Sequence, residues 1–220
     1  MPIEIDSKLL TFKNWTFRLR MPQVKPRRLL ILIHGWMGDE NSMGVFAHNI
    51  SPDVAILAPR GIVAVPEGGY SWREIKPGTW GTASLDEFRS AADAMVTFVD
   101  EWSASAGLDE NQFDLMGFSQ GAALTYTLAL LYPQRIRRLA ALSGFIPAGG
   151  SVLLAGKDLS GKPVFISHGR QDDTIPVEQS RQAAAQLQLA GAQVTYCESD
   201  AGHKVSKDCL KELLTFFEKN

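Results

Sequence analysis

Short apolar runs recur along the chain and predict the strands of a sheet. Each run is nearly continuous in apolar residues, which is typical of parallel strands covered on both faces. The runs are LLILI at 29–33, VAILA at 54–58, QFDLM at 112–116, RRLAALS at 137–143, PVFIS at 163–167 and QVTYCE at 193–198. Before them, LLTFKNWTFRLR at 9–20 mixes aromatic and β-branched residues and predicts one or two antiparallel strands.

Helical patterns separate these runs. Over 84–105 apolar residues recur at three- and four-residue steps, and Ser84 and Glu87 have the spacing of a capping box. Residues 120–132 are apolar on nearly every side, and 177–191 and 206–219 complete the predicted helices. Strands that alternate with helices predict an α/β fold. We expect a mostly parallel central sheet with helices on both faces, antiparallel N-terminal strands, and a single domain over 1–220.

Charge and composition exclude several classes of protein. The chain has 22 basic and 24 acidic residues and a net charge of −2, so no strong field favours nucleic acid or an anionic membrane. The longest aliphatic run is too short for a bilayer, and the N-terminus lacks the pattern of a signal peptide. Cys197 and Cys209 show no metal spacing and are expected to stay reduced. These features predict a soluble, cytoplasmic protein.

Residues 117–121, GFSQG, carry the strongest chemical signal. They follow a predicted strand directly and open a predicted helix, as the nucleophile elbow of a serine hydrolase does. Glycine two positions either side of Ser119 removes side chains that such a tight turn would press against neighbouring backbone. The alternative is an ordinary glycine-bracketed turn in which Ser119 is only the N-cap of the helix.

A serine nucleophile needs a base, and His203 is the candidate. It lies between the last strand and the last helix, where an imidazole can reach over the carboxyl edge of the sheet. His34 and His168 each follow a strand and are expected to order strand-end loops. His48 is expected on the surface.

The acid that orients the base is expected after the strand at 163–167. Two candidates, Asp172 and Asp173, lie there, and one of them is expected to be part of an ordinary polar turn. The chain order of serine, acid and histidine is that of the α/β-hydrolases. Three independent positions therefore agree on a catalytic triad.

The loops at the strand ends supply the remaining candidates. The backbone N–H of Gln120 is the first expected donor to the oxyanion, and Trp36, or less favourably Met37, supplies the second. Residues 61–75 show no helical pattern and are expected to form a loop over the pocket. Apolar side chains in strand-end loops form either an acyl groove or ordinary packing beneath those loops; they are Trp36, Met37, Phe118, Phe145, Ile146 and Ile175.

The chain resembles the phospholipase/carboxylesterase family of α/β-hydrolases, which includes acyl-protein thioesterases and small bacterial carboxylesterases. The resemblance runs from about residue 28 to the end. Its motifs are HGWMGDE at 34–40, GFSQGAAL at 117–124, LAALSGFIP at 139–147, SHGRQDDTIPV at 167–177 and DAGH at 200–203. In the family pattern the acid comes four residues after the histidine of an HG-x-x-D element, which implies Asp172 rather than Asp173.

Three departures from the family pattern lie outside the proposed triad; the first bears on the choice of oxyanion donor, and the other two bear on the acyl pocket. The oxyanion loop has one residue more than the usual HG-x-GD, within Trp36-Met37. The chain reads YSWREI at 70–75 where members often have an AWFDI-like segment. It also has Ala122 where GFSQGG is common. The family's substrate is therefore not carried over.

These observations predict a serine hydrolase of carboxylic esters or thioesters that works through an acyl-enzyme, with no metal or organic cofactor. Lysophospholipid or lactone hydrolysis on the same triad is the alternative within enzymes. A non-catalytic ligand-binding protein of the same fold is the alternative outside them. The resemblance also allows a homodimer.

Overall fold

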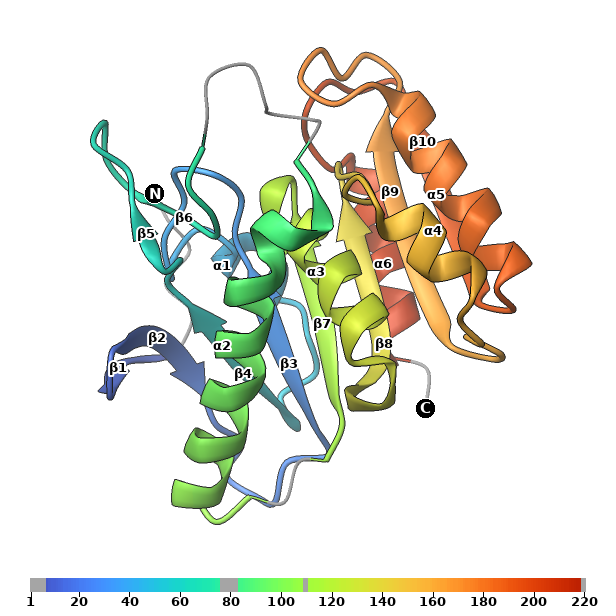
Figure 1. Cartoon of the computed structure of the whole chain (residues 1–220). Helices are drawn as coiled ribbons and strands as arrows, with labels where there is room; N and C mark the ends of the chain where they lie inside the picture. The colour runs from blue at the N-terminus through green and yellow to red at the C-terminus, as the bar shows by residue number, and fades with distance from the viewer. Residues whose placement is uncertain (1–6, 76–82, 109–110, 219–220) are drawn as a thin grey trace.

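An eight-stranded sheet organises the molecule, in the order β1-β2-β4-β3-β7-β8-β9-β10, and Figure 1 shows helices on both of its faces. The structure is a computed structural model that describes residues 7–75, 83–108 and 111–218. From β4 to β10 neighbouring strands are parallel, whereas β1 pairs with β2 and β2 with β4 antiparallel. This is the predicted α/β-hydrolase architecture.

Each predicted apolar run forms one strand, and the run at 9–20 forms two. Every residue of β3 and of β4 is buried, as expected for strands covered on both faces. The bounds are β1 Lys8–Phe12, β2 Trp15–Arg20, β3 Arg28–Ile33, β4 Val54–Pro59, β7 Phe113–Phe118, β8 Ile136–Leu142, β9 Pro163–Gly169 and β10 Gln193–Ser199.

The four predicted helices are present, and the capping box at Ser84 is formed. Its Oγ accepts from the Glu87 N–H, and the Glu87 carboxylate accepts from the Ser84 N–H. The carboxylate thereby satisfies a donor that the first turn of a helix leaves open. The bounds are α2 Leu85–Ser105, α3 Gln120–Leu131, α5 Val177–Leu189 and α6 Lys207–Glu218.

Four short elements were not predicted from the sequence. They are α1 Gly44–Ala47, the 3-10 turn Pro133–Arg135, α4 Gly150–Ala155 and a hairpin of β5 Val63–Ala64 with β6 Tyr70–Ser71. The hairpin partly replaces the loop expected over 61–75. Each element is too short to show a hydrophobic period, so the sequence gives no signal for it.

Two apolar cores lie on opposite faces of the sheet. The larger core joins the sheet to α2, α3, α4 and α5. The smaller core joins it to α1 and α6, which lies behind the sheet in Figure 1. Each face of the sheet therefore carries its own helical cover, and the loops at the carboxyl edge lie between the two layers.

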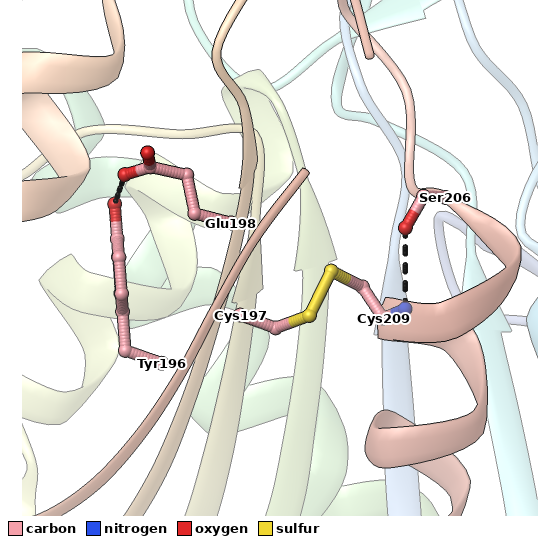
Figure 2. Close-up of a disulfide and its surroundings, with 5 residues drawn as sticks. All are labelled: Tyr196, Cys197, Glu198, Ser206 and Cys209. Atoms are coloured by element: carbon pink, nitrogen blue, oxygen red, sulfur yellow. Dashed lines mark hydrogen bonds between the residues drawn. A yellow bond between two sulfur atoms is a disulfide. The ribbon is translucent and has the colours of Figure 1, made fainter. Parts of the chain in front are cut away.

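The cysteines correct the sequence interpretation. They were expected to be reduced, but Cys197 on β10 and Cys209 on α6 form a disulfide, with 5.6 Å between their Cα atoms (Figure 2). The pair joins a strand to a helix, so its proximity depends on the fold rather than on spacing in the sequence. Within the described residues, no helix has the length and apolarity needed to cross a membrane.

Candidate active site

Three parallel strands deliver the predicted catalytic side chains to one edge of the sheet. Ser119 follows β7, Asp172 follows β9, and His203 lies in the loop after β10. The carboxyl ends of parallel strands meet at the same edge, so residues 53 and 31 positions apart in the sequence come together there. The parallel arrangement of the strands therefore accounts for the proximity of the three side chains.

The backbone at Ser119 forms a sharp turn between β7 and α3. Its φ of 55° and ψ of −117° lie in a region that non-glycine residues rarely adopt. A Cβ on Gly117 would lie 2.2 Å from the Gly121 carbonyl oxygen, and a Cβ on Gly121 would lie 2.1 Å from that of Ile33. Both glycines are therefore required by the close approach of backbone at the elbow.

The side chain of Ser119 does not serve as a helix cap. It stands at the N-cap position of α3 but makes no capping hydrogen bond. Its Oγ lies 2.9 Å from Nε2 of His203 instead. The interpretation of Ser119 as a simple N-cap therefore does not fit the structure.

His203 connects the serine to a buried carboxylate. Its Nδ1 lies 2.7 Å from Oδ2 of Asp172, whose side chain is fully buried. Because a carboxylate accepts hydrogen bonds, this contact favours the tautomer with the proton on Nδ1, which leaves Nε2 as an acceptor for the Ser119 hydroxyl. The contacts thus form a continuous path from Ser119 to Asp172.

Of the two candidate acids, only Asp172 reaches His203. The second oxygen of Asp172 accepts from the backbone N–H groups of Thr174 and Ile175, at 3.0 and 2.9 Å. These two bonds hold the carboxylate plane, so that Oδ2 faces the imidazole. Asp173 is exposed, and its carboxylate lies 3.4 Å from the Thr174 hydroxyl. It belongs to the polar turn.

The other histidines occupy the predicted places. His48 is exposed. Nε2 of His168 bonds the Ile175 carbonyl at 2.8 Å and so orders the turn that carries Asp172. Nε2 of His34 accepts from the Gly61 N–H at 2.9 Å, and burial lowers the pKa of His34 below its ordinary value. His34 is therefore a neutral, structural imidazole.

The side chain of Gln120 has a role that the sequence did not reveal. Its Oε1 accepts from the Trp72 N–H at 2.9 Å, and its Nε2 donates to the Ser71 hydroxyl at 2.9 Å. The Trp72 indole N–H in turn donates to the His34 carbonyl at 2.8 Å. Gln120 therefore ties the start of α3 to the strand β6 and to the loop after β3. No short motif signals such a contact between distant loops.

The loop after β3 turns back beside Ser119. The Gly38 N–H donates to the Gly35 carbonyl at 3.1 Å, which closes a turn with Trp36 and Met37 at its centre. Trp36 borders the same cavity as Ser119, whereas Met37 borders an adjacent one. Of these two candidate oxyanion donors, only Trp36 lines the cavity that contains Ser119.

We name the cavity beside Ser119 the catalytic hollow; its volume is about 200 Å³. Four residues of the predicted apolar set line it, namely Trp36, Phe118, Phe145 and Ile175. Met37 lines the neighbouring cavity together with Phe118, while Ile146 packs against the larger core. The predicted apolar set is thus divided among three environments.

The strand that leads to His203 is held by an ion-pair cluster at Glu198. Its carboxylate accepts from Arg181 at 2.7 and 2.9 Å, from Arg170 at 2.7 Å and from the Tyr196 hydroxyl at 2.8 Å. The Arg181 hydrogen bonds, with those from Tyr196 and Arg170, lower the pKa of Glu198 to about 2. The charged form of Glu198 is therefore favoured in the folded protein.

Acid should weaken the fold through this cluster. Because the pKa of Glu198 is lower in the folded state, its stabilisation is present above the unfolded pKa of about 4.3 and is lost as the pH falls towards 2. Urea unfolding of Glu198→Gln and wild type should differ most at pH 6–7, and the difference should shrink below pH 4. The exposed Glu67→Gln is the control. A difference that does not change with pH would contradict the assignment.

Comparison with known proteins gives consistent matches. The family model described as Phospholipase/Carboxylesterase matches residues 15–220. MhqD of Bacillus subtilis (strain 168) is 26% identical over 81% of this chain and 86% of that protein. Acyl-protein thioesterase 1 of Saccharomyces cerevisiae is 29% identical over 52% of each chain, so the match spans about half of the yeast protein. A carboxylesterase structure from Mesorhizobium loti has a TM-score of 0.82 and 25% identity, and the match covers 98% of this chain and 100% of that one.

Proposed function

Since the chain belongs to the phospholipase/carboxylesterase family of α/β-hydrolases, we propose that it cleaves carboxylic esters or thioesters with Ser119 as nucleophile. The observation that carries this proposal is the continuous contact from Ser119 Oγ through His203 to the buried Asp172, at 2.9 and 2.7 Å. Nucleophile, base and orienting acid within hydrogen-bond reach are the requirement for acyl transfer at a serine.

The three side chains act in turn in the proposed reaction. His203 Nε2 takes the proton of the Ser119 hydroxyl as its oxygen attacks the acyl carbonyl. The imidazolium then protonates the alcohol or thiol that leaves, which gives an acyl-enzyme. Water then attacks the acyl-enzyme while His203 takes a proton from it, and the imidazolium returns that proton to Ser119 Oγ as the ester bond breaks, which releases the carboxylic acid and restores the serine hydroxyl. Asp172 stabilises the imidazolium throughout.

The negative oxygen of each tetrahedral intermediate needs backbone donors. The Gln120 N–H belongs to the first turn of α3, where a helix leaves its N–H groups without intrahelical partners. We assign it as one donor and the Trp36 N–H as the other, with Met37 as the alternative. One such donor typically contributes about 3 kcal/mol to transition-state stabilisation.

The proposal extends to the substrate and the setting of the protein. Phe118, Phe145 and Ile175 are proposed to contact the part of the substrate that lies around the scissile carbonyl. The chemistry needs no metal or organic cofactor. A single domain over 1–220, a cytoplasmic location and a homodimer remain part of the proposal. Stable disulfides are rare in reducing compartments, so a cytoplasmic protein would hold its disulfide only reversibly.

A probe that labels only an activated serine tests this function. A fluorophosphonate should form one adduct per chain, and peptide mass spectrometry should place it on Ser119. The same protein should hydrolyse members of a p-nitrophenyl ester series from acetate to palmitate. Folded protein that takes up no label and turns over no ester would overturn the proposal in favour of a ligand-binding role.

A further inference from the structure

A second cavity adjoins the catalytic hollow, and we name it the α1 groove. Its volume is about 440 Å³, and it shares Gly35, Trp36 and Phe118 with the hollow that holds Ser119. It is lined further by Met37, Val45 and Phe46 on one side and by Lys204, Val205 and Leu210 on the other. The two cavities therefore adjoin, and a group bonded at the scissile carbonyl can extend from the catalytic hollow into the α1 groove.

The α1 groove is apolar in character. Met37 is 41% exposed and Val45 51% exposed, so two large apolar side chains remain in water when the groove is empty. Lys204 is the one charged residue that lines it among the described residues. Covering these surfaces with an apolar group removes them from water, which favours a hydrocarbon occupant over a polar one.

The position of His203 distinguishes the two sides of the substrate. The imidazole must protonate the group that leaves, so that group lies on the histidine side of the carbonyl. Lys204 and Val205, which follow His203 directly, line the α1 groove, and the Phe118 ring packs 5.1 Å from the imidazole ring. Resting on the proposed function, we infer that the α1 groove binds an apolar alcohol or thiol leaving group.

Met37 lines this groove and leaves 41% of its surface exposed. Its φ of 60° is left-handed, a conformation that a residue with a side chain adopts at a cost. The hairpin holds it there, because a Cβ on Gly69 would lie 2.1 Å from the Met37 carbonyl oxygen and the Tyr70 N–H bonds the Gly38 carbonyl at 2.8 Å. Met37, one of the two residues within which the oxyanion loop is longer than the family pattern, is thereby a specificity-determining side chain.

Two substrate series test the assignment of the groove. With the acetyl group constant, kcat/KM for ethyl, butyl, hexyl and octyl acetate should rise about two- to fourfold per methylene until the groove is filled. Met37→Asn introduces a residue that tolerates positive φ but replaces an apolar side chain of the groove with a polar one. Val45→Asn makes the same apolar-to-polar replacement on α1. Each should lower the ratio of octyl to ethyl kcat/KM about tenfold. Val152→Asn on α4, where Val152 is 82% exposed, is the control and should leave the ratio unchanged.

The outcomes separate the groove from the proposed function. A ratio that neither groove variant changes would overturn the inference while ester hydrolysis itself persists. Selectivity that follows acyl length, measured with p-nitrophenyl acetate to octanoate, would assign the groove to the acyl chain and overturn the leaving-group assignment. Absence of hydrolysis for every ester would instead refute the proposed function.

The disulfide carries a second, independent inference about His203. Cys197 and Cys209 lie twelve residues apart, and His203 stands midway, six residues from each. Figure 2 shows the bond joining β10 to the first turn of α6, where the Ser206 hydroxyl accepts from the Cys209 N–H at 3.2 Å. The bond therefore closes the chain segment that carries the proposed base.

The ion pairs of Glu198 hold the β10 end of this segment, and other contacts hold the stretch that follows Ser199. The Ala201 carbonyl accepts from the Gln171 N–H at 2.9 Å, and Asp200 pairs with Arg170 at 2.7 Å on the surface. The disulfide fixes both ends of the segment, which limits how far the imidazole can move from Ser119. We propose that the cysteines are positioning residues for His203, so that the oxidised protein is the more active form.

Reduction tests this role. Tris(2-carboxyethyl)phosphine takes an oxygen atom from water to become the phosphine oxide and leaves two thiols. In the reduced protein, kcat for p-nitrophenyl acetate and the rate of fluorophosphonate labelling should fall about tenfold, while KM changes less than twofold. The variant Cys197→Ala/Cys209→Ala should behave like the reduced protein and should not respond to the phosphine. Circular dichroism at the assay temperature verifies that both forms are folded.

Two results would overturn the positioning role. Equal kcat in the oxidised and reduced forms would do so, because the segment would then hold its geometry without the bond. A response of the alanine variant to the phosphine would also do so, because the effect would not come from these cysteines. If neither the oxidised nor the reduced protein takes up the fluorophosphonate, the proposed function is refuted instead.

Discussion

Replacing Ser119 with alanine is expected to lower kcat for p-nitrophenyl esters by about 10⁴- to 10⁶-fold. Removing the serine of such a triad costs about as much as removing the whole triad, since the remaining members have no nucleophile to serve. The side chain is half-buried and makes no capping bond to α3, so the fold should lose little when the hydroxyl is removed. The expected change is therefore in kcat rather than in stability.

Matched variants make this test specific. Ser151→Ala removes an exposed hydroxyl that bonds Gln186 on the surface, and it should keep full turnover. Both alanine variants should unfold within about 1 kcal/mol of wild type, because Ser151 is on the surface and the Ser119 side chain makes no bond to the helix that it precedes. The Ser119→Ala protein should also take up no fluorophosphonate. Retention of a tenth or more of the wild-type kcat would exclude Ser119 as the nucleophile.

The positions of the proposed triad could be predicted because they depend on topology. Apolar runs located β7, β9 and β10, and parallel strands deliver their carboxyl ends to one edge of the sheet. This placement and the glycines of the elbow were enough to predict Ser119 and His203 from the sequence. They were not enough to choose between Asp172 and Asp173. The structure shows why: backbone donors at Thr174 and Ile175 orient only the first of the two carboxylates towards the imidazole.

The contacts that the sequence did not reveal join separate elements of the fold. The Gln120 amide bonds Ser71 in β6 and Trp72 directly after it, 49 and 48 positions earlier, and the disulfide joins consecutive elements that no spacing rule connects. Cysteine count alone favoured free thiols because two cysteines make no framework. The helix α1 has four residues and no period, so the groove beside it could not be foreseen. Met37 was a candidate for the pocket, but its left-handed backbone follows from the hairpin packed against it.

Asp172→Asn is expected to lower kcat by about 10⁴-fold at pH 7, and the reason is the direction of one hydrogen bond. The backbone N–H groups of Thr174 and Ile175 both need an acceptor at the Oδ1 position, so the amide oxygen should stay there. The amide NH₂ would then face Nδ1 of His203, which must become an acceptor and leave the proton on Nε2. That imidazole cannot take the proton of Ser119.

Asp173→Asn is the matched control one residue away, and its exposed carboxylate should be replaceable with less than a twofold change in kcat. Equal losses in the two variants would mean that the turn as a whole, rather than the carboxylate of Asp172, supports the base.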